Sequence, residues 1–169
     1  KAGERHIIVA SMNRLYDEQH EPIGTITVNR DISSEKRRAR LQERIGVILE
    51  AIATGEALPA ILESLVHAIE EFSPEIKASL LLLDAKTKQL RFGAAPSLPA
   101  AYNAAIDGLT IGAGKGSCGT AAFEKRLVIV EDIATDPLWQ DFKQLAAAHG
   151  LEACWSQPVI DASGTVLAT

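Results

Sequence analysis

Residues 111–121 read IGAGKGSCGTA, and this glycine-rich stretch decides how the second half of the chain is interpreted. It contains Gly-x-Gly-x-x-Gly at 114–119, but a dinucleotide site needs that pattern inside a parallel βαβ unit, which the flanking sequence lacks. A P-loop is excluded because Gly116 stands where Ser or Thr must follow Lys115. We interpret the glycines as a tight turn that leads into a helix over about 117–125.

The sequence on both sides of this turn predicts a mixture of helices and short strands. Apolar periodicity and turn residues predict the following strands and helices: strands at 78–84, 90–93, 127–130, 153–160 and 165–169, and helices at 58–72, 100–106 and 142–149. A loop is expected at 132–141. This order favours an α+β fold with a mainly antiparallel central sheet flanked by helices.

The first 30 residues predict a β-hairpin. Two apolar segments, 5–15 and 23–29, flank the polar turn 16–22. A two-stranded hairpin is only marginally stable in water. We therefore expect it to belong to a larger sheet or to pair with another chain.

A connector helix is expected to follow the hairpin, from Ser33 or Ser34 as its cap to about Thr54, with Gly55 ending it. Its apolar residues follow the four-three spacing of a coiled-coil seam: Leu41, Ile45, Ile48 and Ile52. The stripe is shorter than the three or four heptads typical of a coiled coil. Two interpretations stay open, a homodimer interface and packing on the helix's own domain.

Composition limits the classes of function. The chain has 169 residues, 47% of them hydrophobic, which suits one domain or slightly more. Its net charge of −5 argues against nucleic-acid or direct membrane contact, and the basic run at 36–40 is read as a solvated helix face. Two cysteines make no disulfide framework, so a cytoplasmic location is expected. Both ends read as strand, as if cut within domains, and no metal site or cofactor is specified.

Several motifs resemble GAF domains of bacterial multidomain sensors, over about residues 45–169. They are GAGKGSCGTAA at 112–122, VIVEDI at 128–133, DPLW at 136–139, LEACWSQPV at 151–159 and GTVL at 164–167. The resemblance implies a sensory and dimerisation module upstream of a histidine kinase or a GGDEF/EAL cyclic-di-GMP output. It implies no catalytic activity in this segment.

The N-terminal part resembles the end of a PAS domain. GTITVNRDIS at 24–33 is similar to a final PAS strand and its Asp-Ile-Thr exit, and SEKR at 34–37 is similar to the start of a signalling helix. The resulting division assigns 1–32 to the C-terminal hairpin of a PAS domain and 33–55 to the connector helix. The resemblance implies that residues 56–169 belong to a GAF domain whose C-terminal end is expected to lie beyond this sequence.

The GAF resemblance implies a ligand site between the sheet and the segments that cover it, here 99–106, 114–120 and 132–142. The candidate ligand-binding residues for an unidentified small molecule are Arg91, Tyr102, Ser117, Cys118, Trp139, Trp155 and Gln157. Backbone N–H groups of Ser117 and Cys118 would hold an anionic or carbonyl group, and Arg91 a carboxylate. The alternative is that the aromatic side chains fill the core and no ligand binds.

Two alternative functions known among GAF domains, sulfoxide reduction and bilin binding, match the cysteines of this sequence less well. Cys118 matches a cysteine of free methionine-(R)-sulfoxide reductases, whose chemistry needs a second thiolate in the loop after the next strand. That loop, 132–141, contains no cysteine, and Cys154 falls later, in a predicted strand. The cysteine contexts also differ from those of bilin-binding GAF domains.

Overall fold

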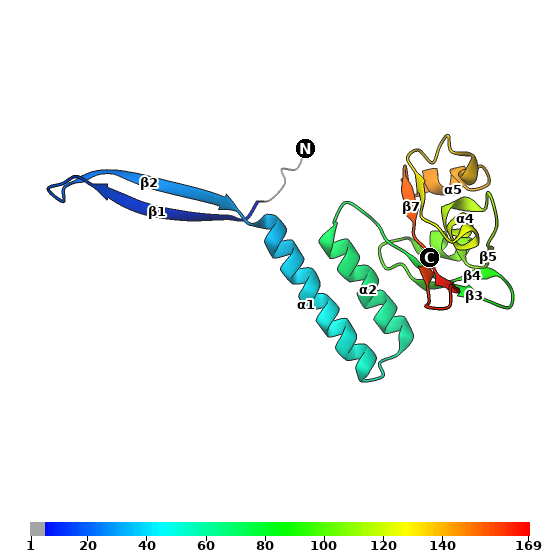
Figure 1. The fold of residues 1–169 in the computed structure, drawn as a ribbon. Helices are drawn as coiled ribbons and strands as arrows, with labels where there is room; N and C mark the ends of the chain where they lie inside the picture. Colours follow the sequence, from blue (N-terminus) through cyan, green and yellow to red (C-terminus); the bar gives the residue numbers. More distant parts are fainter. Residues whose placement is uncertain (1–5) are drawn as a thin grey trace. The chain divides into compact units, whose positions relative to one another are not determined.

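The computed structural model describes residues 6–169, so Arg5, where the first strand was predicted to begin, lies outside the described residues. The chain divides into two compact units, one reaching to Val47 and the other spanning Ile48–Thr169. Figure 1 shows the elements of each unit.

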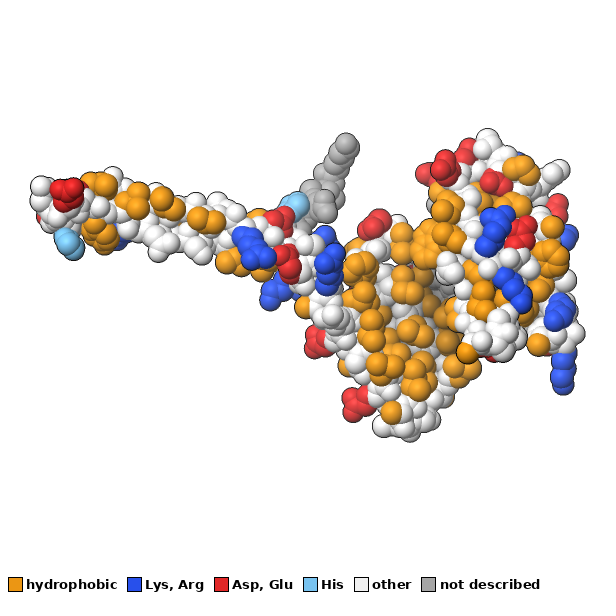
Figure 2. All heavy atoms as spheres, in the orientation of Figure 1, with side chains coloured by type: hydrophobic (Ala, Val, Ile, Leu, Met, Phe, Trp, Pro, Cys, Tyr) orange, Lys and Arg blue, Asp and Glu red, His pale blue; other side chains and the backbone are white. Residues whose placement is uncertain are grey.

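The first unit contains the predicted β-hairpin. Strands β1 (Ile8–Tyr16) and β2 (Pro22–Asp31) pair antiparallel, and Asp17 organises the turn by accepting hydrogen bonds from the amides of Gln19 and Glu21 at 2.9 and 2.8 Å. All residues of both strands are exposed. Hydrophobic side chains along the hairpin therefore face solvent (Figure 2). Within the described residues the hairpin buries neither face, as expected for an isolated pair of strands.

Helix α1 (Ser33–Ala53) matches the predicted connector helix, and Gly55 follows two residues after its end. Gly55 has a φ of 77°, and the amides of Gly55 and Glu56 donate to the carbonyls of Ile52 and Ala51. These are the two hydrogen bonds of a Schellman motif, which favours glycine at the left-handed position.

The second unit is built on an antiparallel sheet in the order β5-β4-β3-β9-β8. Its elements after α1 are α2 (Leu58–Phe72), β3 (Leu80–Asp84), β4 (Gln89–Ala94), α3 (Ala100–Ile106), β5 (Leu109–Thr110), α4 (Gly116–Glu124), β6 (Val128–Val130), η1 (Pro137–Trp139), α5 (Lys143–Ala148), β7 (Cys154–Ser156), β8 (Val159–Ile160) and β9 (Val166–Ala168). The predicted α+β class and antiparallel sheet are confirmed.

Alternation along β3 creates the layers of this unit. Leu80 and Leu82 pack with α2, whereas Leu81 and Leu83 join the core that includes Ala122 of α4. Successive strand residues point to opposite faces, so a fully apolar strand can hold helices on both sides. The sheet therefore lies between α2 and α4.

The predicted strand over 153–160 is wrong as one continuous element. It divides into β7 and β8, which belong to different sheets because β7 pairs with β6 and β8 pairs with β9. Pro158 lies between them and has no amide hydrogen for a ladder bond. The short strand β5 and the 3-10 helix η1 were not predicted.

The apolar stripe of α1 is partly buried within the chain itself. Ile48 is only 5% exposed, whereas Ile45 and Ile52 are 44% and 53% exposed. Ile48 therefore cannot serve the predicted seam without leaving its own core. Leu49, at 59% exposure, continues the exposed stripe instead.

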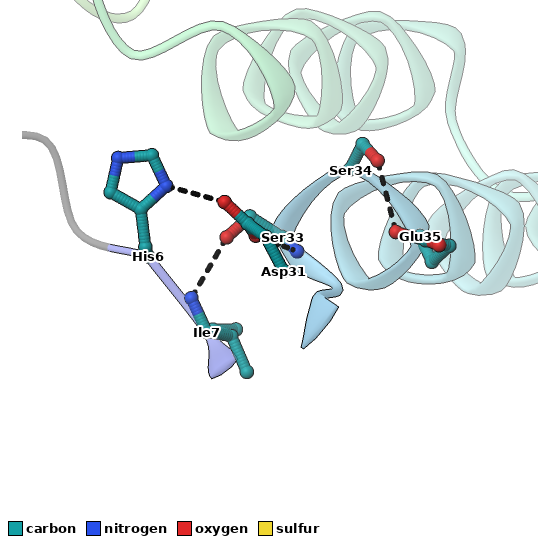
Figure 3. Close-up of polar contacts among 6 residues, drawn as sticks. All are labelled: His6, Ile7, Asp31, Ser33, Ser34 and Glu35. Atoms are coloured by element: carbon teal, nitrogen blue, oxygen red, sulfur yellow. Dashed lines mark hydrogen bonds and ion pairs between the residues drawn. The ribbon is translucent and has the colours of Figure 1, made fainter. Parts of the chain in front are cut away.

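A compact set of hydrogen bonds joins the hairpin to α1 (Figure 3). Asp31 accepts from the backbone amide of Ser33 at 2.9 Å and bonds His6 Nδ1 at 2.7 Å. The hydroxyl oxygen of Ser33, itself buried, accepts from the amide of Ile7 at 2.8 Å. The prediction that Ser33 or Ser34 caps the helix is corrected. Asp31 accepts a hydrogen bond from the amide of Ser33 at the helix start, whereas the Ser33 hydroxyl accepts one from Ile7, just before β1.

The pKa of Asp31 should lie well below the usual value of an aspartate. Hydrogen bonds from the side chain and amide of Ser33, followed by His6, lower its pKa from 3.8 to about 2. Because the folded pKa is depressed, the carboxylate stabilises the junction above about pH 4, and this contribution is lost as the pH falls through about 2. A titration followed by carboxyl ¹³C NMR would measure the pKa of Asp31. Ser33→Ala should raise the Asp31 pKa, and an unshifted Asp31 in the parent chain would contradict this assignment.

Candidate functional site

The start of α4 is shaped by the glycines of the motif. Gly114 and Gly116 have φ values of 73° and 62°, which favour glycine. A Cβ on Gly119 would lie 2.9 Å from the Cβ of Lys115 and 3.4 Å from the carbonyl oxygen of Thr110. The predicted tight turn into a helix is confirmed, and it places Ser117, 2% exposed, in the interior.

Strand β7 lies against the start of α4. Cys154 and Ser156 are two residues apart and therefore share one face of the strand, whereas Trp155 points to the other face. Trp155 is 57% exposed and lies opposite Ile129 of β6, which is also exposed.

Two thiol–hydroxyl contacts join α4 to β7. Cys118 Sγ lies 3.2 Å from Ser156 Oγ, and the Cys154 thiol donates to Ser117 Oγ at 3.2 Å. Ser156 is 6% exposed, and both cysteines are free and partly buried. The interior thus holds two thiols and two hydroxyls in alternation, which we call the thiol–hydroxyl cluster.

Two aromatic side chains border this cluster. Burial raises the pKa of Tyr102 above its usual range, and the nearby sulfurs of Cys118 and Cys154 add to the shift. Tyr102 also meets the ring of His149 edge to face, at a centroid distance of 5.6 Å. Trp139 is 7% exposed and packs in the core cluster that Cys154 adjoins.

The indole nitrogen of Trp139 is buried and makes no hydrogen bond within the described structure. Burial of a polar group without a partner costs free energy, so a ligand acceptor at this point would be stabilised. Burial also raises the pKa of the Cys154 thiol, and the Ser117 hydrogen bond partly offsets that rise. Hydroxyl, thiol and indole N–H groups therefore lie in the same part of the core.

The structure brings together four of the seven predicted ligand residues, namely Tyr102, Ser117, Cys118 and Trp139. Arg91 instead pairs with Asp107 at 3.0 Å and is exposed. Trp155 and Gln157 are exposed as well. The positions of Arg91, Trp155 and Gln157 do not support the prediction that they contact a ligand, and it stays a prediction.

Sequence reasoning missed Ser156 and placed Cys154 in a strand without naming a partner for it. The signal that could have found Ser156 is its two-residue spacing from Cys154 on a short strand. Its partner, Cys118, lies 38 residues earlier in the chain, which no local pattern indicates.

Two other kinds of feature are absent from residues 6–169. No helix there is long and apolar enough to span a membrane. In the same residues no group of three or more His, Cys, Asp or Glu side chains is arranged to hold a metal ion.

The layered antiparallel sheet and its interior site define an α+β domain of the kind found in signalling proteins. A family model of the GAF domain matches residues 55–169, and the chain belongs to this family. It is 37% identical over 137 residues to the methyl sulfide methyltransferase-associated sensor of Methanosarcina acetivorans. That match covers 81% of this chain but only 14% of the relative's length.

Solved structures support the same fold. The GAF domain of a phosphoenolpyruvate-protein phosphotransferase from Coxiella burnetii has a TM-score of 0.58 at 16% identity, with 77% of this chain and 74% of that chain covered. Free methionine-R-sulfoxide reductase from Neisseria meningitidis, in complex with its substrate, has a TM-score of 0.56 at 17% identity, with coverages of 78% and 69%. At these identities the likeness shows the fold alone.

The two tryptophans should report different environments. Trp155→Phe leaves only the buried Trp139, so its emission should be blue-shifted and poorly quenched by acrylamide. Trp139→Phe leaves only the exposed Trp155, which should emit at longer wavelength and be readily quenched. Circular dichroism would verify that both variants are folded, and equal quenching of the two would contradict the orientation of β7.

Proposed function

We propose that the chain is a sensory and dimerisation segment of a larger signal-transduction protein, with no catalytic activity of its own. The observation that carries the proposal is the interior thiol–hydroxyl cluster, which meets the unpartnered N–H of Trp139 inside a GAF domain. Such a set of buried donors suits the recognition of a small acceptor molecule. The kinship with a named sensor supports a sensory role.

The proposed arrangement follows the sequence. Residues 1–32 would complete a PAS domain, α1 would transmit the signal, and the GAF domain would bind the ligand. The output would be a histidine kinase or a GGDEF/EAL cyclic-di-GMP domain elsewhere in a longer, cytoplasmic protein. The small fraction of the M. acetivorans sensor that this chain covers is consistent with one module among several.

The proposed homodimer would form along α1. Ile45, Leu49 and Ile52 are spaced by four and three residues and all three are at least 44% exposed. This spacing places them on one side of the helix. A second copy of α1 would bury this stripe and leave Ile48 in its own core.

The dimer can be tested by sedimentation velocity at tens of micromolar. The parent chain should sediment as a dimer. Ile45→Asp combined with Ile52→Asp should weaken association roughly 100-fold or more, because two apolar side chains lose their burial. Ile129→Asp, a change at a similarly exposed residue of β6, should leave the dimer intact. A monomeric parent chain would disprove the interface.

Ligand binding can be tested by native mass spectrometry of the chain as purified. We expect a non-covalent adduct whose release on unfolding gives a small molecule. Trp139→Phe removes the buried N–H while keeping an aromatic ring, so it should reduce occupancy. Trp155→Phe is the matched control and should retain the adduct. An absence of adduct from the parent chain, also after incubation with cell extract, would favour a role in dimerisation and relay alone.

A further inference from the structure

Strand β6 has one edge that pairs with no other strand. The structure joins β6 to β7 alone, so within residues 6–169 its second edge takes part in no sheet. Such an edge presents unpaired backbone N–H and C=O groups to which another strand can add. Proteins usually protect an edge with proline or lysine, but β6 itself consists of three β-branched residues, Val128, Ile129 and Val130.

One face of the β6–β7 pair is apolar and exposed. Ile129 and Trp155 lie directly opposite one another across the two strands and are 63% and 57% exposed. Leu127, two residues before Ile129, shares this face by strand alternation and is exposed as well. Val128 and Val130 occupy the other face, which is buried in the core. The domain therefore covers one face of this strand pair and leaves the other to solvent.

The charges beside β6 have opposite signs at its two ends. Lys125 and Arg126 precede the strand and are exposed, whereas the exposed carboxylates of Glu131 and Asp132 follow it. In an antiparallel pair the beginning of one strand lies beside the end of the other. A second copy of β6 in that orientation therefore places each basic end beside an acidic end.

The present contacts of the two cations do not oppose this arrangement. Lys125 donates to the carbonyl of Gly164 at 2.6 Å, and Arg126 pairs with Glu124. Both contacts lie at the surface, where ion pairs contribute little and partners are readily exchanged. The flanks of β7 contain no lysine or arginine, so charge complementarity of this kind belongs to β6 alone of the two strands.

We propose that β6 is a self-association surface, through which two copies of this chain pair antiparallel about a twofold axis perpendicular to the sheet. This contact goes beyond the proposed function, because it joins GAF domains and not α1 helices. With Val128 on the axis, Leu127 lies opposite Ile129 of the second copy. In the same register Lys125 lies opposite Glu131 of the second copy, and symmetry makes each pair occur twice. With Ile129 on the axis, Leu127 would instead lie opposite a carboxylate, so the first register is favoured.

The twofold axis also joins the two apolar faces, because a rotation about it leaves both on the same side of the sheet. The contact is nevertheless weak, since one short strand with its flanks is smaller than a standard interface. Its exposed ion pairs are screened by salt. At tens of micromolar α1 therefore dominates assembly, and β6 joins the resulting dimers at higher concentration.

The test uses the chain that carries Ile45→Asp and Ile52→Asp, so that α1 does not contribute. In sedimentation experiments from tens of micromolar into the submillimolar range, this chain should pass from monomer to dimer, and added salt should oppose the change. Hydrogen exchange of peptides that cover β6 should slow over the same range. Ile129→Asp should weaken the association roughly tenfold or more, because a charge replaces an apolar cross-strand contact.

An exchange of charges tests the orientation of the two strands. In the same background, Lys125→Glu and Glu131→Lys each place like charges opposite one another, so each variant alone should lose dimerisation. An equimolar mixture of the two should restore it, because the exchanged charges are complementary between the variants. Lys88→Glu is the matched control, since Lys88 is an exposed lysine whose φ of 57° equals that of Lys125 within one degree. This control should dimerise like the background chain.

Circular dichroism would verify that every variant is folded. A background chain that stays monomeric at all soluble concentrations would overturn the inference. Association that Ile129→Asp leaves unchanged, or a mixture that fails to restore dimerisation, would overturn it as well. The α1 dimer and the ligand are measured in chains with native α1, so failure here is distinguishable from failure of the proposed function.

Discussion

The close approach of the first turn of α4 to its neighbours is the constraint on which the interior site depends. Glycine at 119 admits the Lys115 side chain, because a Cβ at this position would lie only 2.9 Å from the Cβ of Lys115. Positive φ angles at 114 and 116 turn the chain into the helix. As a result Ser117 and Cys118 enter the interior beside β7, where both make hydrogen bonds.

The position of this site within the layers connects it to most of the domain. Elements α3, α4, η1 and β7 each contribute a side chain to it, namely Tyr102, Cys118, Trp139 and Cys154. A change in any of these contacts therefore acts on several elements together, because a closely packed interior transmits displacement.

The junction between the hairpin and α1 is stabilised by hydrogen bonds, whereas the interior site is stabilised by packing in the core. The hairpin has no buried face in the described residues, so its link to α1 depends on hydrogen bonds rather than on a core. Asp31 and Ser33 each satisfy a backbone amide at this junction. Both side chains act over a few ångströms across the boundary between strand and helix. A displacement of the hairpin would thus be felt first at the N-terminal end of α1.

Sequence alone determined the family, the hairpin, α1, α2 and α3, because local periodicity, capping residues and ordered motifs specify them. It also predicted four of the residues at the interior site. The tertiary structure decided which side chains meet: Cys118 contacts a serine 38 positions later, and Ile48 turns inward while Ile45 stays exposed. It also decided that Trp155 faces outward, since its neighbours Cys154 and Ser156 both contact α4 and successive strand residues point to opposite faces. Such choices depend on which surfaces pack together, and that information is spread over distant parts of the chain.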